Sequence, residues 1–303
     1  RVAVDIAPVH SLVARVMLGV GTPRLIIPPG ASPHEYNLRP SEAAALQDSD
    51  LVFWVGEDLT PWMAGAIETL AAEADVTTLL EVDGVMLLDV REGALFEAHA
   101  HDHGDDDHAE HAEGHDHDNE EHADAGAHDH DHDHPHGAHD PHVWLSPANA
   151  AVWLDVIAAE LSAADPDNAG TYFGNAAAAK EELAAVSAEV NATLEPVRGL
   201  SFVVFHDAFQ YFETAFDVPA SGAISLSDAT DPSPARIAEI RGRVSAEGIR
   251  CVLSEPQFNP GIVATVMDGT GANTAVLDPL GSDLEPGPDL YPQLLRNLAT
   301  SLA

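Results

Sequence analysis

Cysteine and basic residues are scarce in this chain. Its 303 residues include one cysteine, Cys251, so no disulfide can form within the chain. Lys and Arg number 12 against 51 Asp and Glu, and the formal charge of −39 repels nucleic acid and anionic membrane surfaces while it attracts cations. No apolar run reaches the ~18 residues that a membrane-spanning helix needs. The composition therefore excludes a disulfide scaffold and argues against nucleic-acid binding and direct membrane insertion.

The length of the chain suggests two domains, each with a core of its own. The chain begins at Arg1 rather than at Met, so we expect a processed form from which a signal peptide has been removed. Cys251 opens the apolar run CVL, where a small buried hydrophobe is expected and a reactive thiol is not.

Histidine, by contrast, is concentrated in one segment between Glu97 and Asp140. This tract contains fourteen of the 18 histidines and sixteen acidic residues, but no Lys or Arg. Imidazole binds zinc, copper and nickel, and carboxylates help to neutralise a dication. The tract has almost no apolar residue larger than Ala, so it is predicted to be disordered without metal. The histidines that we interpret as auxiliary metal ligands are His99, His101, His103, His108, His111, His115, His117, His122, His128, His130, His132, His134, His136 and His139.

Two simpler explanations of the tract account for less of its composition. An expression tag is usually terminal and regular, whereas this tract is internal, irregular and mixed with acids. A solvated acidic loop explains the Asp and Glu residues but not the histidines. The composition therefore predicts a polyvalent collector of transition-metal ions.

Short apolar runs alternate with helical patterns along the first part of the chain. Strands are predicted at 2–6, 24–27, 51–55 and 76–80, and helices at 8–18, 41–47 and 61–72. Ser41 is predicted as the N-cap of its helix. Strands separated by helices of this length indicate parallel β-α-β units, which the histidine tract interrupts as a long surface insertion.

The alternation resumes after the tract. Helices are predicted at 148–162, 168–194, 208–216, 234–246, 260–268 and 289–302, and strands at 202–205, 251–254 and 274–277. At ~1.5 Å per residue the second of these helices would be about 40 Å long, which suits a rigid connection between two lobes, although an ordinary surface helix has the same pattern. The predicted fold class is α/β, with two lobes of mainly parallel sheet. The predicted domains are an N-terminal lobe (1–166), a linking helix (167–197) and a C-terminal lobe (198–303).

Four histidines lie outside the tract, and three of them occupy places that suit a binding site. His34 follows the second predicted strand, His142 lies in the turn before a helix, and His206 follows the strand FVVF. Asp278 follows the strand TAVL in the same manner. Because ligands of open α/β sheets bind at loops beyond the carboxyl ends of the strands, these four residues are predicted to converge on a cleft between the lobes. Three imidazoles and one carboxylate form a tetrahedral zinc set.

The spacing of these residues carries little information by itself. The intervals are 108, 64 and 72 residues, and the chain has no local zinc motif such as HExxH. His10, the remaining histidine outside the tract, is expected to serve in packing or at a helix start rather than as a ligand. Asp207 is a candidate to orient His206, since zinc-bound imidazoles usually donate their other N–H group to an acceptor. Glu255 is expected to have a supporting or structural role.

The same segments carry a family resemblance. The motifs are PPGASPHEYNLRPS (28–41), SDLVFWVG (49–56), DPHVWLSP (140–147), FVVFHDAFQYF (202–212), EPQFNP (255–260) and LDPLG (277–281). In this order they resemble the metal-specific solute-binding proteins of bacterial ABC importers, and within them the zinc-binding, ZnuA-like branch. The motifs span the chain from end to end, and a histidine-rich insertion before DPHVWLSP is also typical of that branch.

The resemblance implies two α/β lobes joined by a long rigid helix, with one metal ion in the cleft. By motif position it implies His34, His142 and His206 as ligands, and Asp278 as a residue that binds the metal or lies beside it. Manganese-binding relatives typically carry a glutamate where this chain has His206, and a third imidazole favours zinc over a harder ion. Some zinc-binding members have an acid before the first histidine, where this chain has Pro33. The fourth ligand is therefore expected to be Asp278 or a water molecule.

Three functions are compatible with these residues. The one that we favour is a monomeric periplasmic protein that captures Zn(II) with high affinity and delivers it to the membrane permease of an ABC importer, while the tract collects additional zinc. The second is a zinc hydrolase, but a carboxylate in the fourth position leaves no site for substrate and no general base is evident, so an enzyme is not expected. The third is a metal buffer whose function lies wholly in the tract.

Overall fold

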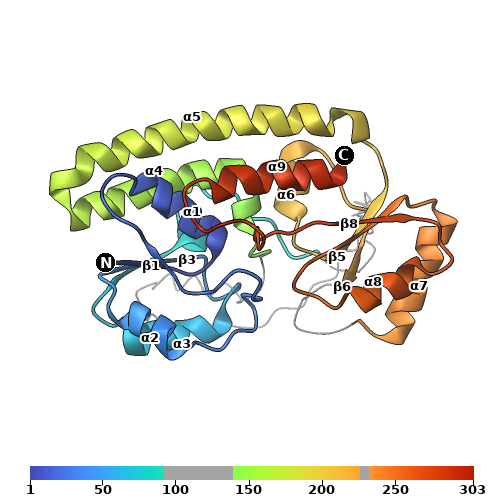
Figure 1. The fold of residues 1–303 in the computed structure, drawn as a ribbon, viewed down its shortest axis with the longest axis horizontal. Helices are drawn as coiled ribbons and strands as arrows, with labels where there is room; N and C mark the ends of the chain where they lie inside the picture. Colours follow the sequence, from blue (N-terminus) through green and yellow to red (C-terminus); the bar gives the residue numbers. More distant parts are fainter. Residues whose placement is uncertain (92–138, 226–231) are drawn as a thin grey trace, which may run out of the picture.

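The computed structural model describes residues 1–91, 139–225 and 232–303. The predicted disorder of the tract and all of its histidines except His139 lie outside the described residues. The described residues form two α/β lobes, each with a four-stranded parallel sheet, and one long helix extends across both (Figure 1). The predicted fold class is confirmed.

The N-terminal lobe is built around one parallel sheet. Its elements are β1 (Val2–Val4), α1 (Ala7–Val16), β2 (Arg24–Leu25), α2 (Pro40–Gln47), β3 (Leu51–Trp54), α3 (Pro61–Leu70), β4 (Asp75–Thr78) and the 3₁₀ turn η1 (Leu79–Glu81). The strands are paired in the order β2-β1-β3-β4. The central strands β1 and β3 are apolar throughout and wholly buried, because helices cover both faces of a parallel sheet.

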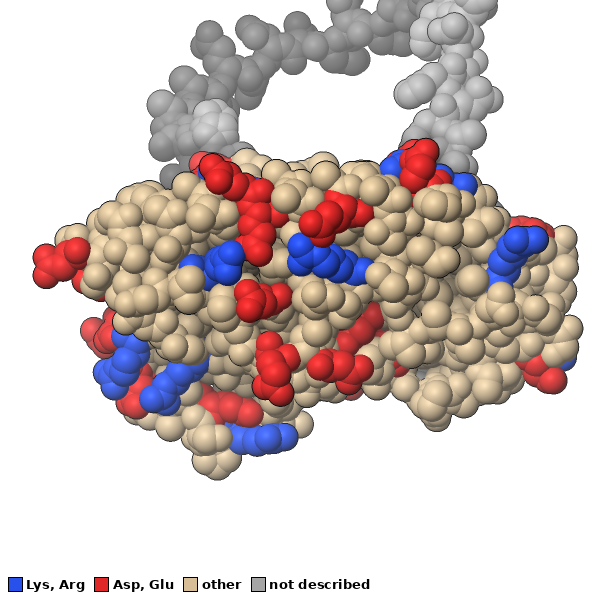
Figure 2. Space-filling model, turned by 45° about the horizontal axis from the view of Figure 1, so that its top comes forward, with Lys and Arg blue, Asp and Glu red and all other residues tan. Residues whose placement is uncertain are grey.

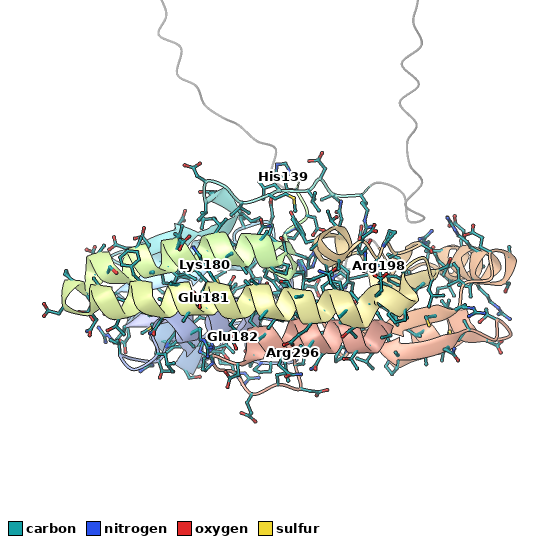
Figure 3. The ribbon with its side chains drawn as sticks, turned by 90° about the horizontal axis from the view of Figure 1, so that it is seen from above. His139, Lys180, Glu181, Glu182, Arg198 and Arg296 are labelled. Carbon is teal, nitrogen blue, oxygen red and sulfur yellow. The ribbon has the colours of Figure 1, made fainter. Side chains whose placement is uncertain are left out.

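Three helices lie along one side of the molecule, and the longest of them packs against the other two (Figures 1 and 3). They are α4 (Pro147–Ala164), α5 (Ala169–Leu194) and α9 (Leu290–Leu302). The 3₁₀ turn η2 (Val143–Leu145) precedes α4. The 3₁₀ turns η3 (Pro166–Asn168) and η4 (Glu195–Val197) lie directly before and after α5. Helix α5 has 26 residues without an internal proline, so it is about 39 Å long and reaches from one lobe to the other.

Helix α5 is held against its neighbours mainly by an apolar stripe and also by ion pairs. The buried residues of the stripe recur every three or four positions and are Tyr172, Ala176, Ala179, Leu183, Val186, Val190 and Leu194. Lys180 pairs with Asp155 of α4, and Arg296 of α9 pairs with Glu189, each at 2.7 Å (Figure 3). These pairs are half exposed and contribute little energy by themselves, so the stripe supplies most of the stability.

The C-terminal lobe repeats the strand order of the first. Its elements are β5 (Phe202–His206), α6 (Gln210–Phe216), β6 (Ala223–Ser225), α7 (Pro234–Ala246), β7 (Cys251–Ser254), α8 (Pro260–Met267) and β8 (Asn273–Val276). The order β6-β5-β7-β8 places the first strand of the lobe between its second and third, as in the N-terminal sheet. The two lobes therefore share a topology although no close sequence repeat relates them.

The apolar core is continuous across the lobes. One cluster extends from the N-terminal sheet through α4, α5 and α9 to α6 and the near side of the C-terminal sheet. A second, smaller cluster fills the space between that sheet and helices α7 and α8. The shared core makes the helical layer a common support for both sheets.

The described residues show how charge is distributed on one face of the molecule and whether any helix could span a membrane. The face shown in Figure 2 carries Asp and Glu interspersed with Lys and Arg, so it is not a field of one sign. In the part of the chain that the structure describes, no helix is both long enough and apolar enough to cross a membrane.

Every predicted helix and strand is present, with ends displaced by at most two residues. One strand was missed and one expectation was wrong. Strand β6 was not predicted, because three residues are too short to show an alternation. Ser41 is not an N-cap: Arg39 has that position, since Pro40 takes the first helical position, where proline is favoured. The side chain of Glu42 accepts a hydrogen bond from the Arg39 N–H group at 2.7 Å.

Candidate metal centre

The carboxyl ends of the strands carry the predicted site residues. His206 is the last residue of β5, and Glu255 directly follows β7. His34 lies in the loop between β2 and α2, and His142 directly precedes η2. Strands β5 and β7 are neighbours at the point where the strand order of the sheet reverses, which is where open α/β sheets bind their ligands.

The fold brings three of the four predicted ligands together. One nitrogen from each of His34, His142 and His206 lies within 4.8 Å of the others, and no further group of this kind occurs among the described residues. The Nε2 atoms of His142 and His206 are 3.3 Å apart. Two nitrogens bound to one tetrahedral zinc ion at about 2.0–2.1 Å would be separated by about 3.3–3.4 Å. The spacing of this pair therefore fits a single zinc ion.

Asp140 orients His142. Its Oδ1 atom lies 2.7 Å from Nδ1 of His142 and accepts a second hydrogen bond from the backbone N–H of the same residue at 3.0 Å. Because an ionised carboxylate only accepts hydrogen bonds, Nδ1 is the protonated nitrogen and Nε2 keeps its lone pair for a metal. The Asp140 side chain is 4% exposed, so this bond is shielded from water.

Glu255 orients His206 in the same way. Both of its carboxylate oxygens lie 2.8 Å from Nδ1, and Oε1 also accepts from the backbone N–H at 3.1 Å. The strand register explains this contact. Phe202 of β5 pairs with Cys251 of β7. His206 lies four positions after Phe202, and Glu255 lies four positions after Cys251, so the two residues are level with each other. The supporting role expected for Glu255 has this physical basis.

Asp207 does not orient His206, contrary to the sequence-based expectation. Its carboxylate pairs with Arg91 instead, whose guanidinium also binds Glu213 at 2.8 Å. Successive residues of an extended chain point to opposite sides, so Asp207 turns away from the histidine that precedes it. Burial raises the pKa of the Asp207 carboxyl, although the hydrogen bond from Arg91 lowers it.

The site combines neutral ligands with buried negative charge. The Nε2 atoms of His142 and His206 face each other at 3.3 Å, so a cation between them would contact both. Asp140 and Glu255 are both nearly inaccessible to water, and each supports one imidazole from behind. A carboxylate that accepts the second N–H group of a histidine makes that histidine a stronger ligand, as in carboxylate–histidine–zinc sites.

The cavity at the histidines is small. Its volume is about 10 Å³, close to the room that one water molecule occupies. Trp144 and Phe258 are apolar walls, and the indole N–H of Trp144 donates to the carbonyl of Pro279 at 2.8 Å, which fixes the ring. A space of this size has room for an ion or a single water molecule. Its lining residues are Ser32, Pro33, His34, His142, Trp144, His206, Glu255, Gln257, Phe258, Pro279 and Leu280.

Asp278 is not brought into the histidine group. Its carboxylate accepts hydrogen bonds from the backbone N–H groups of Leu280 and Ser282 and from the side chain of Gln257. The register gives the reason. Ser254 pairs with Val276, so the residue level with Glu255 is Leu277, and Asp278 lies one position beyond it. A shift of one residue turns a side chain to the other side of the chain.

His10 is a packing residue, as expected. Its Nε2 atom lies 3.1 Å from the carbonyl oxygen of Pro23, its side chain is buried, and it lies outside the histidine group. Burial lowers the pKa of this imidazole, although the hydrogen bond to Pro23 opposes the shift.

The described ends of the tract adjoin the site. Asp89 and His139 form an antiparallel bridge, and their side chains are 3.1 Å apart (Figure 3 labels His139). Arg91, at one end, binds Asp207 beside His206, and Asp140, at the other, binds His142. Sequence reasoning missed both contacts. The adjacency in DPHVW was a signal for Asp140, whereas nothing local marks Arg91.

Comparison with known proteins agrees with this architecture. The sequence model of the ZnuA family, zinc-uptake complex component A, periplasmic, matches residues 2–303. The high-affinity zinc uptake system protein ZnuA of Brucella abortus (strain 2308) is 50% identical over 301 residues, which cover 99% of this chain and 90% of that protein. The protein of the same name from Paracoccus denitrificans (strain Pd 1222) is 47% identical over 304 residues, with 100% and 90% covered.

A solved structure shows the same fold. The crystal structure of a ZnuA deletion mutant with zinc bound has a TM-score of 0.74 to this chain at 20% identity, and the match covers 99% of this chain and 95% of the other. At that identity the likeness concerns the fold alone. The family match over almost the entire chain and the relatives of about half identity lead to one conclusion: this chain belongs to the ZnuA family of periplasmic zinc-uptake components, which are metal-binding transport proteins and not enzymes.

Proposed function

We propose that this chain captures one Zn(II) ion in the cleft, with His34, His142 and His206 as ligands, and delivers it to the membrane permease of an ABC importer. The observation that carries the proposal is the pair of Nε2 atoms 3.3 Å apart, each on an imidazole whose Nδ1 is bonded to a buried carboxylate. This arrangement presents two lone pairs to one point, at the separation that tetrahedral zinc requires.

The choice of zinc over a harder ion follows from the donor atoms. Three imidazole nitrogens suit zinc, whereas manganese and magnesium favour carboxylate and water oxygens. Asp140 and Glu255 supply negative charge close to the ion without being ligands themselves. Asp278, the fourth ligand predicted from the sequence, lies outside the histidine group and accepts hydrogen bonds from the backbone N–H groups of Leu280 and Ser282 in its own loop.

The histidine tract is proposed to collect additional zinc at weaker sites and to raise its concentration near the cleft. Two facts support this role. The tract contains alternating His and Asp residues, which are zinc ligands, and the described residues on its two sides contact the site: Arg91 binds Asp207, next to His206, and Asp140 binds His142. Deleting the tract should therefore reduce the number of bound ions more than it reduces the tightest affinity.

Transfer to the permease and the periplasmic location are inferred from the family. We propose that the chain acts as a monomer. Docking on the importer would release the ion, or protonation of the imidazoles at low pH would do so. Ligation needs neutral histidine, and the pKa of a free imidazole is about 6.5, so zinc affinity should fall as the pH drops below that value.

The decisive experiment is a zinc titration against a chelator of known affinity. The full chain and a variant without residues 99–138 are compared, each with and without His206→Ala. The proposal predicts one tight site per chain that survives the deletion and is lost with His206→Ala. His10→Ala is the matched control, since His10 is also buried but makes a packing contact, and it should keep the tight site.

Two outcomes would overturn the proposal. Loss of all tight binding with the tract would make the tract the functional site and the chain a metal buffer. Equal losses for His206→Ala and His10→Ala would mean that the histidine group does not bind the ion.

A further inference from the structure

The loop after β8 holds the Asp278 carboxylate with three donors. Oδ1 accepts from the backbone N–H of Leu280 at 3.0 Å and from Nε2 of Gln257 at 3.2 Å, and Oδ2 accepts from the backbone N–H of Ser282. Two of these donors are main-chain groups of a tight turn. Gln257, which comes from the loop after β7, is the one that reaches Asp278 from outside its own loop.

Gln257 contacts Asp278 and also lines the metal cavity. Its Nε2 also donates to Oγ of Ser282 at 3.0 Å, and its side chain lines the same cavity as the three histidines. Because a carboxylate accepts but does not donate, the end of the amide that faces Asp278 must be the nitrogen. The oxygen, Oε1, is thereby directed away from Asp278.

The Oε1 atom of Gln257 is buried and has no hydrogen-bond partner among the described residues. A buried acceptor without a donor is costly, so such an atom needs an explanation. Three donors of the cavity wall already have acceptors. The Nδ1–H groups of His142 and His206 donate to Asp140 and Glu255, and the indole N–H of Trp144 donates to the carbonyl of Pro279.

A water molecule on a zinc ion is a donor of the required kind. It carries two O–H groups, and the charge of the ion makes them stronger donors than those of free water. Given the zinc site proposed for the cleft, we propose that Gln257 is a positioning residue that selects the fourth ligand of the ion. Its Nε2 holds Asp278 away from the histidines, and its Oε1 accepts a hydrogen bond from the water that completes the site.

This role has a chemical consequence for the site. With three neutral imidazoles and a water, the ion has no carboxylate ligand, which favours a borderline ion such as zinc over a hard ion such as manganese. Water also exchanges more readily than a carboxylate that is fixed in a loop. The fourth position therefore stays open to a group from the partner that receives the ion.

The test uses Co(II) as a spectroscopic substitute for zinc, at one equivalent on the full chain, together with zinc competition titrations. Four proteins are compared: the unaltered chain, Asp278→Asn, Gln257→Leu and the double variant. Asp278→Asn alone should keep the Co(II) visible band, and its zinc affinity should change far less than the ~10–100-fold typical when a supporting group of a metal site is lost. Gln257→Leu should shift the band, because it releases Asp278 and removes the acceptor of the water. Adding Asp278→Asn to Gln257→Leu should then shift the band again, because the released carboxylate is the group that has reached the ion.

Three results would overturn the inference. A shifted band and a loss of about tenfold or more in affinity for Asp278→Asn alone would make Asp278 the resident ligand. An unchanged band in Gln257→Leu would remove any role of the glutamine. Identical spectra for Gln257→Leu and the double variant would mean that Asp278 does not reach the ion after Gln257 is replaced, so that Gln257 does not select the fourth ligand. Gln257→Met, which keeps the length of the side chain, repeats the measurement if the leucine variant does not fold. Failure of the zinc site itself is distinguishable, because then His206→Ala would also leave the Co(II) band unchanged.

Discussion

Replacing Glu255 by Gln would test whether the carboxylate behind His206 strengthens the metal site. Glu255 accepts hydrogen bonds from Nδ1 of His206 at 2.8 Å and from its backbone N–H at 3.1 Å. A glutamine of the same shape has one oxygen for these two donors, and its NH₂ group would face an N–H group. The substitution also removes a negative charge that is almost completely shielded from water. Loss of such a partner typically lowers metal affinity 10–100-fold, which equals about 1.4–2.7 kcal/mol.

The assay is the zinc competition titration, performed on the variant without residues 99–138 so that the cleft site is read alone. Circular dichroism and urea unfolding establish that the fold is retained. Glu239→Gln is the control, because Glu239 lies in an ion pair on helix α7 with its side chain 53% exposed. If Glu255→Gln binds zinc as tightly as the control does, the carboxylate does not act through His206, and the reasoning from the hydrogen bonds is wrong.

Three further predictions concern stability, its pH dependence and zinc affinity. Arg91→Met leaves the carboxylates of Asp207 and Glu213 buried without their shared partner, so the free energy of unfolding in urea should fall by about 3–5 kcal/mol. A loss below about 1 kcal/mol would mean that these ion pairs do not stabilise the fold. Burial raises the pKa of Asp5 to about 7 in the folded chain. The folded state therefore binds this proton more tightly than the unfolded state does, so its contribution is complete below pH ~4 and is lost as the pH rises through about 7. Unfolding of the metal-free chain from pH 4 to 8 should show this loss, and Asp5→Asn should not. Asp140→Asn should lower the zinc affinity of the cleft about 10–100-fold, since Asp140 supports His142 as Glu255 supports His206. Zinc titration of the variant without residues 99–138 measures this affinity. An unchanged affinity would mean that Asp140 does not strengthen His142 as a ligand.

Much of the fold could be predicted because its signals are local. The central strands are short apolar runs such as VAV and LVFW, and several helices begin with a proline, so both kinds of element are visible within a few residues. Strand β6 has three residues and exists because Ala223 pairs with Val204 of β5. Such a strand depends on a partner elsewhere in the chain, and no window of sequence around it contains that information.

The candidate ligands could also be predicted, since each histidine follows a strand or precedes a helix at a recognisable motif. Their partners could not. His206 is bonded to Glu255, 49 positions away, and not to its neighbour Asp207, because the register of β5 with β7 places the first two level. Asp278 was expected with the histidines and is instead held by its own turn and by Gln257.

The sequence by itself determined which residues have the chemistry: three imidazoles outside the tract at the ends of elements, a cluster of acids and histidines, and apolar runs that must be buried. Only the tertiary structure decided that Asp140 binds Nδ1 of His142 and that Glu255 binds Nδ1 of His206. The physical reason is that composition and periodicity act within one segment, whereas hydrogen bonding between strands depends on a register that a shift of one residue would reverse.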